Sequence, residues 1–311
     1  MSAAVPVHVS RLRKRYGAVE ALKGISFHVD RGEMFGLIGP DGAGKTTTIR
    51  LLCGLLHADE GDVRILGHDP VASHRAITAS VGYLSQRFSL YGDLSIDENI
   101  AFFAEIHGVA DYHARRDRLL DMTQLTRFRG RLADQLSGGM KQKLALACTL
   151  VHEPDVIILD EPTTGVDPVS RREFWKLLSQ FLDQGITILM STPYLDEAER
   201  CHRIALLHEG EVLALDQPGR LRGLLPGEWF EVVVDHPRDA AARLAGLAGG
   251  PRTYVFGDRL HVWLDQPRGA NPRGQLDAAL ASIAVAPTMV RAITPSLEDV
   301  FIAKLTGTLA S

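Results

Sequence analysis

Short apolar runs alternate with mixed or amphipathic segments over most of the chain. Four runs have the length of a buried strand, at residues 34–39 (MFGLIG), 81–86 (VGYLSQ), 156–162 (VIILDEP) and 186–191 (ITILMS). The intervening segments that favour helices lie at residues 46–56, 96–108, 112–125 and 138–154. This alternation predicts an α/β fold with a mostly parallel sheet covered by helices. Residues 202–216 predict two further strands around a Glu-Gly turn.

The pattern changes near residues 224–227 (LLPG), where we expect a domain boundary. Beyond it, strand-like and helix-like segments follow in the order βαββαβ, with a hairpin turn at Gly257 and Asp258 and a final helix at residues 295–307. This order predicts a small α+β domain of the split βαβ, ferredoxin-like type. We therefore assign residues 1–224 to a first domain and 225–311 to a second. The second shows no catalytic cluster, so we expect its acids and arginines to form a solvated face of a docking or dimer-forming module.

Composition narrows the class of protein. The chain has 311 residues, 45% of them hydrophobic, and a net charge of −4, which argues against a general nucleic-acid binder. It contains no apolar run of the roughly 18–20 residues that a spanning helix needs, and its first residues lack the apolar core of a signal peptide. We therefore expect a protein kept inside the cell, whose membrane role would need a spanning partner.

Cysteines and histidines give no sign of a metal site. The three cysteines, Cys53, Cys148 and Cys201, are widely spaced and are expected to be buried free thiols. The twelve histidines show no metal-ligand spacing, and His107 and His261 are among those expected to be ordinary surface or turn residues.

The run GPDGAGKTT fits the phosphate-loop pattern G-x-x-x-x-G-K-[ST] between an expected strand and an expected helix. Glycines let backbone N–H groups cradle phosphate oxygens, the lysine reaches the β- and γ-phosphates, and the threonine hydroxyl can ligate Mg²⁺. The pattern therefore predicts a nucleoside triphosphate site. Its residues are Gly39, Pro40, Asp41, Gly42, Ala43, Gly44, Lys45, Thr46 and Thr47.

Two further motifs follow the phosphate loop. Asp160 ends an apolar strand, where its carboxylate can hold Mg²⁺, and Glu161 is placed to face an attacking water. In LSGGMKQK, the residues Ser137, Gly138 and Gly139 open a helix, whose free N–H groups favour an anion. A plain helix cap is the alternative interpretation of this second motif.

The order and spacing of these motifs resemble those of the ATP-binding cassette (ABC) ATPases, in which LSGG is the family signature. The resemblance covers about residues 7–220. It implies a phosphate-loop NTPase fold with a RecA-like core and a helical subdomain at about residues 87–152. In this family Tyr16 would stack on adenine, Gln86 would touch Mg²⁺ and the water, and TGVD at residues 164–167 would form the loop that crosses the dimer seam.

The resemblance to this family also implies the cofactors and the roles of the site residues. The cofactors would be ATP and Mg²⁺. The metal would be held by Thr46, Gln86 and Asp160, and catalysis would involve Glu161, Gln86 and Lys45. Each ATP would lie between the phosphate loop of one subunit and Ser137 and Gly139 of another, in a head-to-tail dimer.

A narrower resemblance is to the ABC-2-type exporter ATPases, which include drug-efflux subunits. It rests on SQRFSLYGDLSIDENI, on the stretch from LSGGMKQK to DEPTTGVDP and on the ending PSLEDVFIAKLTG. It implies a membrane permease partner, a second ATPase subunit in a homodimer or a heterodimer, no nucleic acid, and a peripheral place at the cytoplasmic face of the membrane. Phe88, Leu90 and Tyr91 are candidates for contact with the permease, with a core role as the alternative.

Three positions depart from the family pattern. Asp41 replaces a commoner Asn and is expected to point outward, and Met140 replaces Gln after the signature. Pro193 stands where the family has a switch histidine, and His202 lies too far along the chain to replace it. We expect slowed hydrolysis. The alternative functions are an ATP-dependent clamp with weak hydrolysis and an ABC ATPase outside transport.

Overall fold

The computed structural model describes residues 5–86, 90–264 and 271–307, so predicted contact residue Phe88 lies outside the described residues. The chain forms two compact units, Met1–Gln217 and Pro218–Ser311, and this division falls shortly before the boundary expected at residues 224 and 225. Helix α8 (Pro218–Arg222) consequently belongs to the second unit. Each helix in the described ranges is too short or too polar to cross a bilayer.

A six-stranded sheet lies at the centre of the N-terminal unit and confirms the predicted α/β pattern. All neighbouring strands are parallel except the last pair, which forms the predicted hairpin. In spatial order the strands are β5 (Val81–Leu84), β6 (Val156–Asp160), β7 (Thr187–Thr192), β3 (Met34–Ile38), β8 (Arg203–His208) and β9 (Glu211–Asp216). The carboxyl ends of β3, β6 and β7 therefore meet at one edge of the sheet, where α/β proteins bind ligands.

The same unit also contains a three-stranded antiparallel sheet, which the hydropathy pattern did not predict and which shares a core with the central sheet. Its strands are β1 (Val7–Tyr16), β2 (Val19–Val29) and β4 (Glu60–Ile65), in the order β2-β1-β4. The inward-facing residues of β1 are Val7, Val9 and Leu12, and a register shift separates the last two. Such a bulge breaks the period-two alternation by which strands are recognised.

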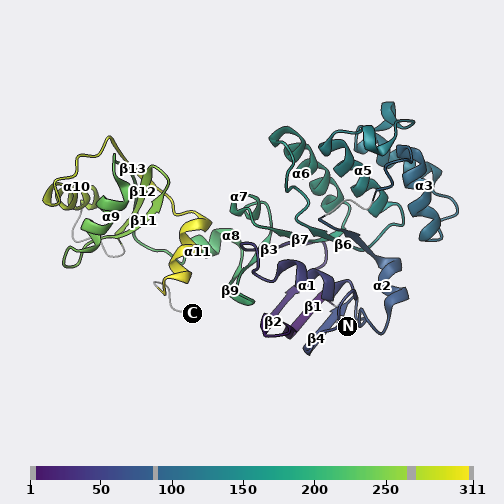
Figure 1. The fold of residues 1–311 in the computed structure, drawn as a ribbon, viewed down its shortest axis with the longest axis horizontal. Coiled ribbons are helices and arrows are strands. Elements are labelled where there is room, and N and C mark those ends of the chain that lie inside the picture. Colours follow the sequence, from purple (N-terminus) through teal and green to yellow (C-terminus); the bar gives the residue numbers. More distant parts are fainter. Residues whose placement is uncertain (1–4, 87–89, 265–270, 308–311) are drawn as a thin grey trace. The chain divides into compact units, whose positions relative to one another are not determined.

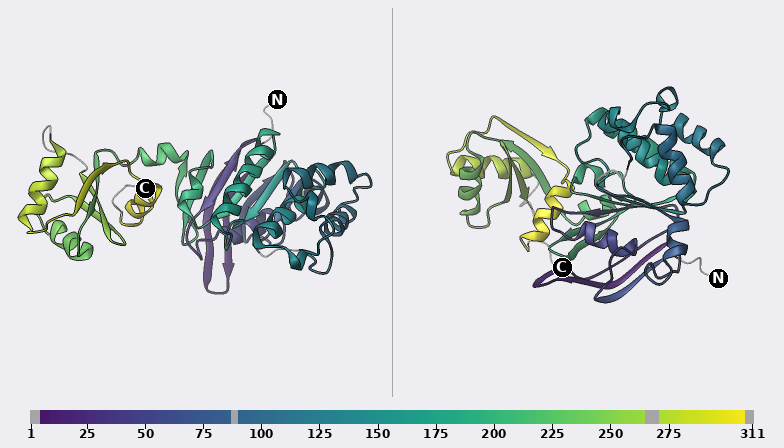
Figure 2. Two further views of the ribbon diagram at one scale, coloured as in Figure 1. Left: turned by 90° about the horizontal axis from the view of Figure 1, so that it is seen from above. Right: turned by 45° about the vertical axis from the view of Figure 1, so that its right-hand side comes forward.

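Helices cover both faces of the central sheet (Figures 1 and 2). Helix α1 (Lys45–Leu52) lies between the two sheets and buries Ile49, Leu51 and Leu52 in their common core. On the opposite face lie α3 (Ile96–Ile106), α5 (Gly138–Leu150) and α6 (Pro168–Asp183). The remaining helices of this unit are α2 (His74–Ser80), α4 (His113–Met122), α7 (Leu195–Ala198) and two 3₁₀ turns, Thr126–Phe128 and Ala133–Gln135.

Side chains cap the N-termini of α3, α5 and α6. Ser95 and Glu98 form a capping box at α3, and Asp167 accepts two backbone N–H bonds at α6, with Pro168 in the first position. Ser137 caps α5 by accepting a bond from Met140 N. The serine of the LSGG motif therefore serves as a helix cap, the alternative that the sequence allowed.

The C-terminal unit is the predicted split βαβ sandwich. Its sheet has the order β11-β12-β10-β13, and all neighbouring strands are antiparallel. The elements are β10 (Glu228–Val233), α9 (Pro237–Ala245), β11 (Arg252–Phe256), β12 (Arg259–Leu264), α10 (Pro272–Ser282), β13 (Met289–Ile293) and α11 (Leu297–Leu305). The helices α9 and α10 pack against Phe230, Val232 and Val262 in a core separate from that of the N-terminal unit. On the sheet, Trp229 and Trp263 stack with ring centroids 5.2 Å apart.

Two acids of this unit, Glu231 and Asp299, lie buried, whereas the sequence predicted that its acids and arginines form a solvated face. Glu231 is 4% exposed and accepts bonds from Arg291 and Arg259, which hold the pKa of its carboxyl below the usual value. His261 lies beside it, with Nδ1 2.7 Å from the buried Asp299 of α11. The prediction for His261 was wrong because a residue of one helix covers the sheet surface on which the histidine lies, and local sequence does not reveal that contact.

Candidate functional site

The loop between β3 and α1 holds the predicted phosphate-binding run. Gly44 caps α1 with a left-handed backbone (φ 103°), and a Cβ there would lie 2.8 Å from the carbonyl of Ala21. Only glycine fits both constraints. Lys45 follows it and is 4% exposed, with Nζ donating to the carbonyls of Gly39 at 2.8 Å and Pro40 at 3.0 Å. The lysine therefore folds back over its own loop.

Glu161 meets the lysine at the carboxyl end of β6. Its Oε1 lies 3.2 Å from Lys45 Nζ, and its Oε2 accepts bonds from Gln86 Nε2 at 3.1 Å and Thr164 Oγ1 at 3.3 Å. The backbone of Glu161 is left-handed (φ 49°), a strained state for a residue with a side chain that its surroundings must hold. The structure thus brings two of the predicted catalytic residues, Lys45 and Gln86, into direct contact with the third, Glu161.

Asp160 and Thr46 converge one residue away. Asp160 Oδ1 accepts bonds from Ser191 Oγ at 2.7 Å and Thr46 Oγ1 at 3.1 Å. Burial raises the pKa of this carboxyl above its ordinary value, while the two hydroxyl bonds oppose that rise. A carboxylate and a hydroxyl that share one point form an oxygen donor set of the kind that suits Mg²⁺. The residues present therefore fit the predicted metal. Gln86, the third predicted ligand, is bonded to Glu161, the residue that follows Asp160.

A cavity of about 660 Å³ opens beside these groups. The predicted site residues that line it are Tyr16, Asp41, Gly42, Gly44, Lys45, Thr46, Thr47, Gln86 and Glu161. Tyr16 is 46% exposed at the end of β1, and Lys14 Nζ lies over its ring, 5.8 Å from the centroid. Gly39, Pro40, Ala43 and Asp160 are not among the described residues that line the cavity. Asp41 is exposed, although it also borders the cavity.

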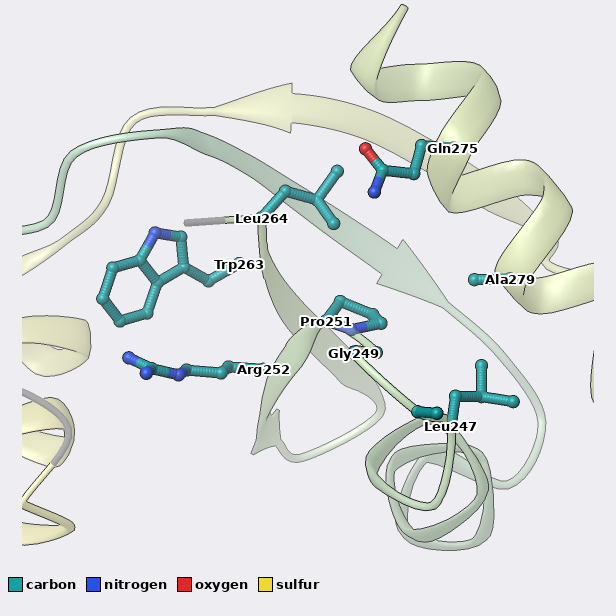
Figure 3. Close-up of a pocket in the computed structure, with 10 residues that line it drawn as sticks. Leu247, Gly249, Pro251, Arg252, Trp263, Leu264, Gln275 and Ala279 are labelled. Atoms are coloured by element: carbon teal, nitrogen blue, oxygen red, sulfur yellow. The ribbon is translucent and has the colours of Figure 1, made fainter. Parts of the chain in front are cut away.

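Another hollow, of about 700 Å³, lies in the C-terminal unit between the loop after α9, helix α10 and the sheet (Figure 3). Apolar side chains such as Leu247, Pro251 and Leu264 line much of it, and its polar side chains are those of Arg252 and Gln275. The guanidinium of Arg252 lies over the indole of Trp263, 4.9 Å from the ring centroid. Among its described lining residues there is no carboxylate or nucleophile. The cavity at the phosphate loop is therefore the candidate site.

Comparison with known proteins agrees with this geometry. The profile of the family described as "ABC transporter" matches residues 22–164. A relative from Burkholderia thailandensis, named Nod factor export ATP-binding protein I, is 37% identical over 306 residues, which cover 97% of this chain and 97% of the relative. The chain belongs to the ABC transporter ATP-binding family.

Two further similarities extend the family assignment. The Escherichia coli protein named probable multidrug ABC transporter ATP-binding protein YbhF is 45% identical over 235 residues, or 74% of this chain, and this chain spans 40% of the length of that relative. A dimeric ATP-binding cassette solved in a post-hydrolysis state with ADP and phosphate is 28% identical, with a TM-score of 0.61 over 68% of this chain and 98% of that one. The fold and the assignment to an ATPase family are thereby confirmed.

The signature of this ABC cassette stands apart from the cavity. Ser137, Gly138 and Gly139 are not among the described residues that line it. Gly139 is instead buried against α6, where a Cβ would meet Ser170 Oγ at 2.2 Å. The signature thus packs closely against the helix that follows the TGVD loop.

Pro193, which is expected from the sequence to stand at the position of the family's switch histidine, is half-buried and lies directly after β7. His202 accepts a bond from Met34 N through Nδ1 at 3.1 Å, at the amino end of β3. The phosphate loop follows the carboxyl end of that strand. His202 therefore lies at the opposite edge of the sheet from Glu161 and does not face the site.

A buried polar network that the sequence pattern does not predict lies beside the site of the ABC cassette. Glu197 of α7 is 1% exposed and accepts bonds from Thr163 Oγ1 at 2.6 Å and Thr192 Oγ1 at 2.7 Å. Ser191 belongs to the same strand end and accepts a bond from Glu161 N at 3.0 Å. Glu197 lies in the polar run DEAER, which gives no hydropathic sign of burial.

Proposed function

We propose that this chain is the ATP-binding and ATP-hydrolysing subunit of an ABC-2-type membrane exporter, with drug efflux as one candidate activity. The observation that carries the proposal is the convergence of Lys45, Gln86 and Glu161 beside the phosphate-loop cavity, next to the Thr46–Asp160 pair. The names of the relatives, multidrug transport in one case and Nod factor export in the other, support an export role.

The cavity suggests how ATP would be placed. The exposed ring of Tyr16 would stack on adenine, and the N–H groups from Gly42 to Thr47 would surround the phosphates at the amino end of α1. Mg²⁺, held by Thr46 and Asp160 with Gln86 nearby, would neutralise the charge of the β- and γ-phosphates.

Binding of ATP would exchange the partners of Lys45. In the structure its ammonium pairs with Glu161 and with two carbonyls of its own loop. A polyphosphate carries more negative charge than these groups and would draw the ammonium away. Glu161 would then be released from Lys45 and could accept a proton from, and orient, a water aligned with the γ-phosphate, with Gln86 beside it.

The signature would act in a second copy. Because Ser137 and Gly139 lie apart from the cavity of their own chain, they would complete the ATP site of a partner in a head-to-tail dimer. We propose a homodimer, with a heterodimer as the alternative, attached to a membrane permease at the cytoplasmic face of the membrane. Leu90 and Tyr91 precede α3 and would contact that permease, and Tyr91 is 47% exposed.

Pro193 favours a second candidate function, an ATP-dependent clamp with weak hydrolysis. Proline has no side-chain donor that could bridge Glu161 and the γ-phosphate. Loss of one positioning group of this kind costs on the order of 10²–10³ in rate. Because Lys45, Thr46, Asp160 and Glu161 are all in place, we propose that hydrolysis is slowed rather than abolished.

Steady-state ATP hydrolysis by the purified protein, alone and with its permease, tests the proposal. We expect Mg²⁺-dependent turnover that Glu161→Gln abolishes and Pro193→His accelerates, while both variants still bind ATP. Absence of turnover with permease and lipid present would support the clamp. An unchanged rate in Pro193→His would show that position 193 does not limit hydrolysis, and failure to co-purify with an adjacent permease would contradict the transport role.

A further inference from the structure

The buried carboxylate of Glu197 joins three segments that surround the site. One oxygen, Oε1, accepts the hydroxyl of Thr163 and lies 3.6 Å from Arg171 Nε of α6. The other, Oε2, accepts the hydroxyl of Thr192 at the end of β7. Because a carboxylate withdrawn from water needs partners for its oxygens, these contacts are tightly constrained. Glu197 thus fixes the turn after β6, the end of β7 and the start of α6 relative to one another.

The turn after β6 is the one that carries Glu161. Thr164 N donates to the carbonyl of Glu161 at 3.2 Å, which closes a tight turn that contains Thr163. The left-handed backbone of Glu161 costs free energy, so the turn keeps its shape only while its neighbours hold it. The hydrogen bond from Thr163 to Glu197 is such a constraint. Thr163 lies two residues after Glu161, whose carboxylate would orient the water.

The end of β7 provides the fixed reference. Thr192 is fully buried, and its carbonyl accepts a bond from Gly39 N at 3.3 Å, so the strand end is tied to the phosphate loop. Tyr194 N donates to Thr192 Oγ1 at 3.1 Å, and the guanidinium of Arg171 covers the Tyr194 ring at 4.8 Å. With proline between Thr192 and Tyr194, this strand end sends no donating side chain from position 193 toward Glu161.

From these contacts we infer that Glu197 is a positioning residue for hydrolysis: it sets the distance between the turn that carries Glu161 and the phosphate loop. The inference rests on the proposed ATPase function, because it concerns the geometry of that reaction. Glu197 does not border the cavity among the described lining residues, so it acts through Thr163 and Thr192 rather than on the nucleotide.

The test compares Glu197→Gln with Asp196→Asn, a matched change at an exposed neighbour on the same helix. The glutamine keeps the size of the side chain, but its NH₂ group cannot accept a hydroxyl proton as the carboxylate oxygen does, so one threonine O–H loses its acceptor. We expect kcat to fall about 10- to 100-fold, as displacement of a reacting group by a fraction of an ångström to an ångström commonly does. The Kd for a fluorescent ATP analogue should change less than about twofold, because the phosphate loop is untouched.

Thr163→Val supplies an independent perturbation of the same contact, since valine has the shape of threonine without its hydroxyl. The double variant with Glu197→Gln should be no slower than the slower single variant, because both remove one interaction. Equal losses in kcat and in nucleotide affinity, or a kcat equal to that of Asp196→Asn, would overturn the inference.

Hydrogen exchange separates this inference from the proposed function. Without nucleotide, Glu197→Gln should speed exchange of the amides of residues 161–167 and leave those of residues 41–47 as in the parent protein. If the parent protein lacks ATPase activity under all conditions, the proposed function fails, and the exchange comparison still decides the role of Glu197. Unchanged exchange in residues 161–167 would refute that role even in an active enzyme.

Discussion

The contact between Lys45 and Glu161 leads to a quantitative prediction about the nucleotide-free protein. Both side chains are buried, with exposed fractions of 3% and 8%, and their charged atoms lie 3.2 Å apart. Lys45→Met removes the cation and leaves a buried carboxylate that retains only the donors of Gln86 and Thr164. Removing one partner of a buried ion pair lowers the free energy of unfolding by about 3–5 kcal/mol. Because two donors to Glu161 remain, we expect a loss of about 3 kcal/mol in this variant.

The reverse change should cost less. In Glu161→Gln the ammonium keeps the carbonyls of Gly39 and Pro40, so we expect a loss of about 1 kcal/mol, the value of one hydrogen bond. The double variant carries neither buried charge and should also lose only about 1 kcal/mol. The two substitutions would then show a coupling energy of about 3 kcal/mol.

The measurement is urea unfolding in EDTA, followed by far-ultraviolet circular dichroism and fitted to two transitions, because the two units have separate cores. Lys23→Met is the matched control: Lys23 also lines the cavity, but its pair with Glu211 is partly exposed, at 33% and 59%, and should contribute less than about 1 kcal/mol. If the losses of Lys45→Met and Glu161→Gln add within about 0.5 kcal/mol, the two groups do not interact and the reasoning fails.

Two further predictions follow from buried groups of the N-terminal unit. Burial, with a smaller contribution from the neighbouring His107, lowers the pKa of His152 to about 4, so the unfolded chain binds more protons as pH falls from about 6.5 to about 4. Stability should therefore be lost over this range, and calorimetry should show a shallower loss in His152→Gln; an identical pH dependence would contradict the reasoning. Gly139→Ala should destabilise the unit by about 1–3 kcal/mol because its methyl group meets Ser170, and Ser170→Gly should restore the melting temperature; lack of rescue would locate the clash elsewhere.

The sequence predicted the elements whose pattern is local. The apolar strands that end at Ile38 and Asp160 and the cap at Ser137 follow from hydropathy and from residue type. The antiparallel sheet escaped prediction because a bulge in β1 interrupts its alternation. Contacts between distant segments could not be inferred: Glu197 is a polar residue in a polar run, and its burial depends on partners 5 and 34 residues away.

The site shows the same division. Its motifs identify which residues belong to it, and Lys45, Gln86 and Glu161 do meet. Their remaining partners are a property of the fold, since Lys45 also donates to two carbonyls of its own loop. Likewise, the sequence around Glu231 does not predict its pairing with Arg259 and Arg291, which lie on two other strands.

The indole rings of this protein are unequally distributed. Of its three tryptophans, Trp229 and Trp263 lie stacked in the C-terminal unit, whereas Trp175 lies on α6 in the N-terminal unit. Intrinsic fluorescence of the whole chain therefore mixes a stacked pair in one unit with a single emitter in the other. Replacing the stacked pair with phenylalanine would leave one optical reporter, on the helix that packs against the LSGG motif. Emission from that variant would follow the nucleotide-binding unit alone.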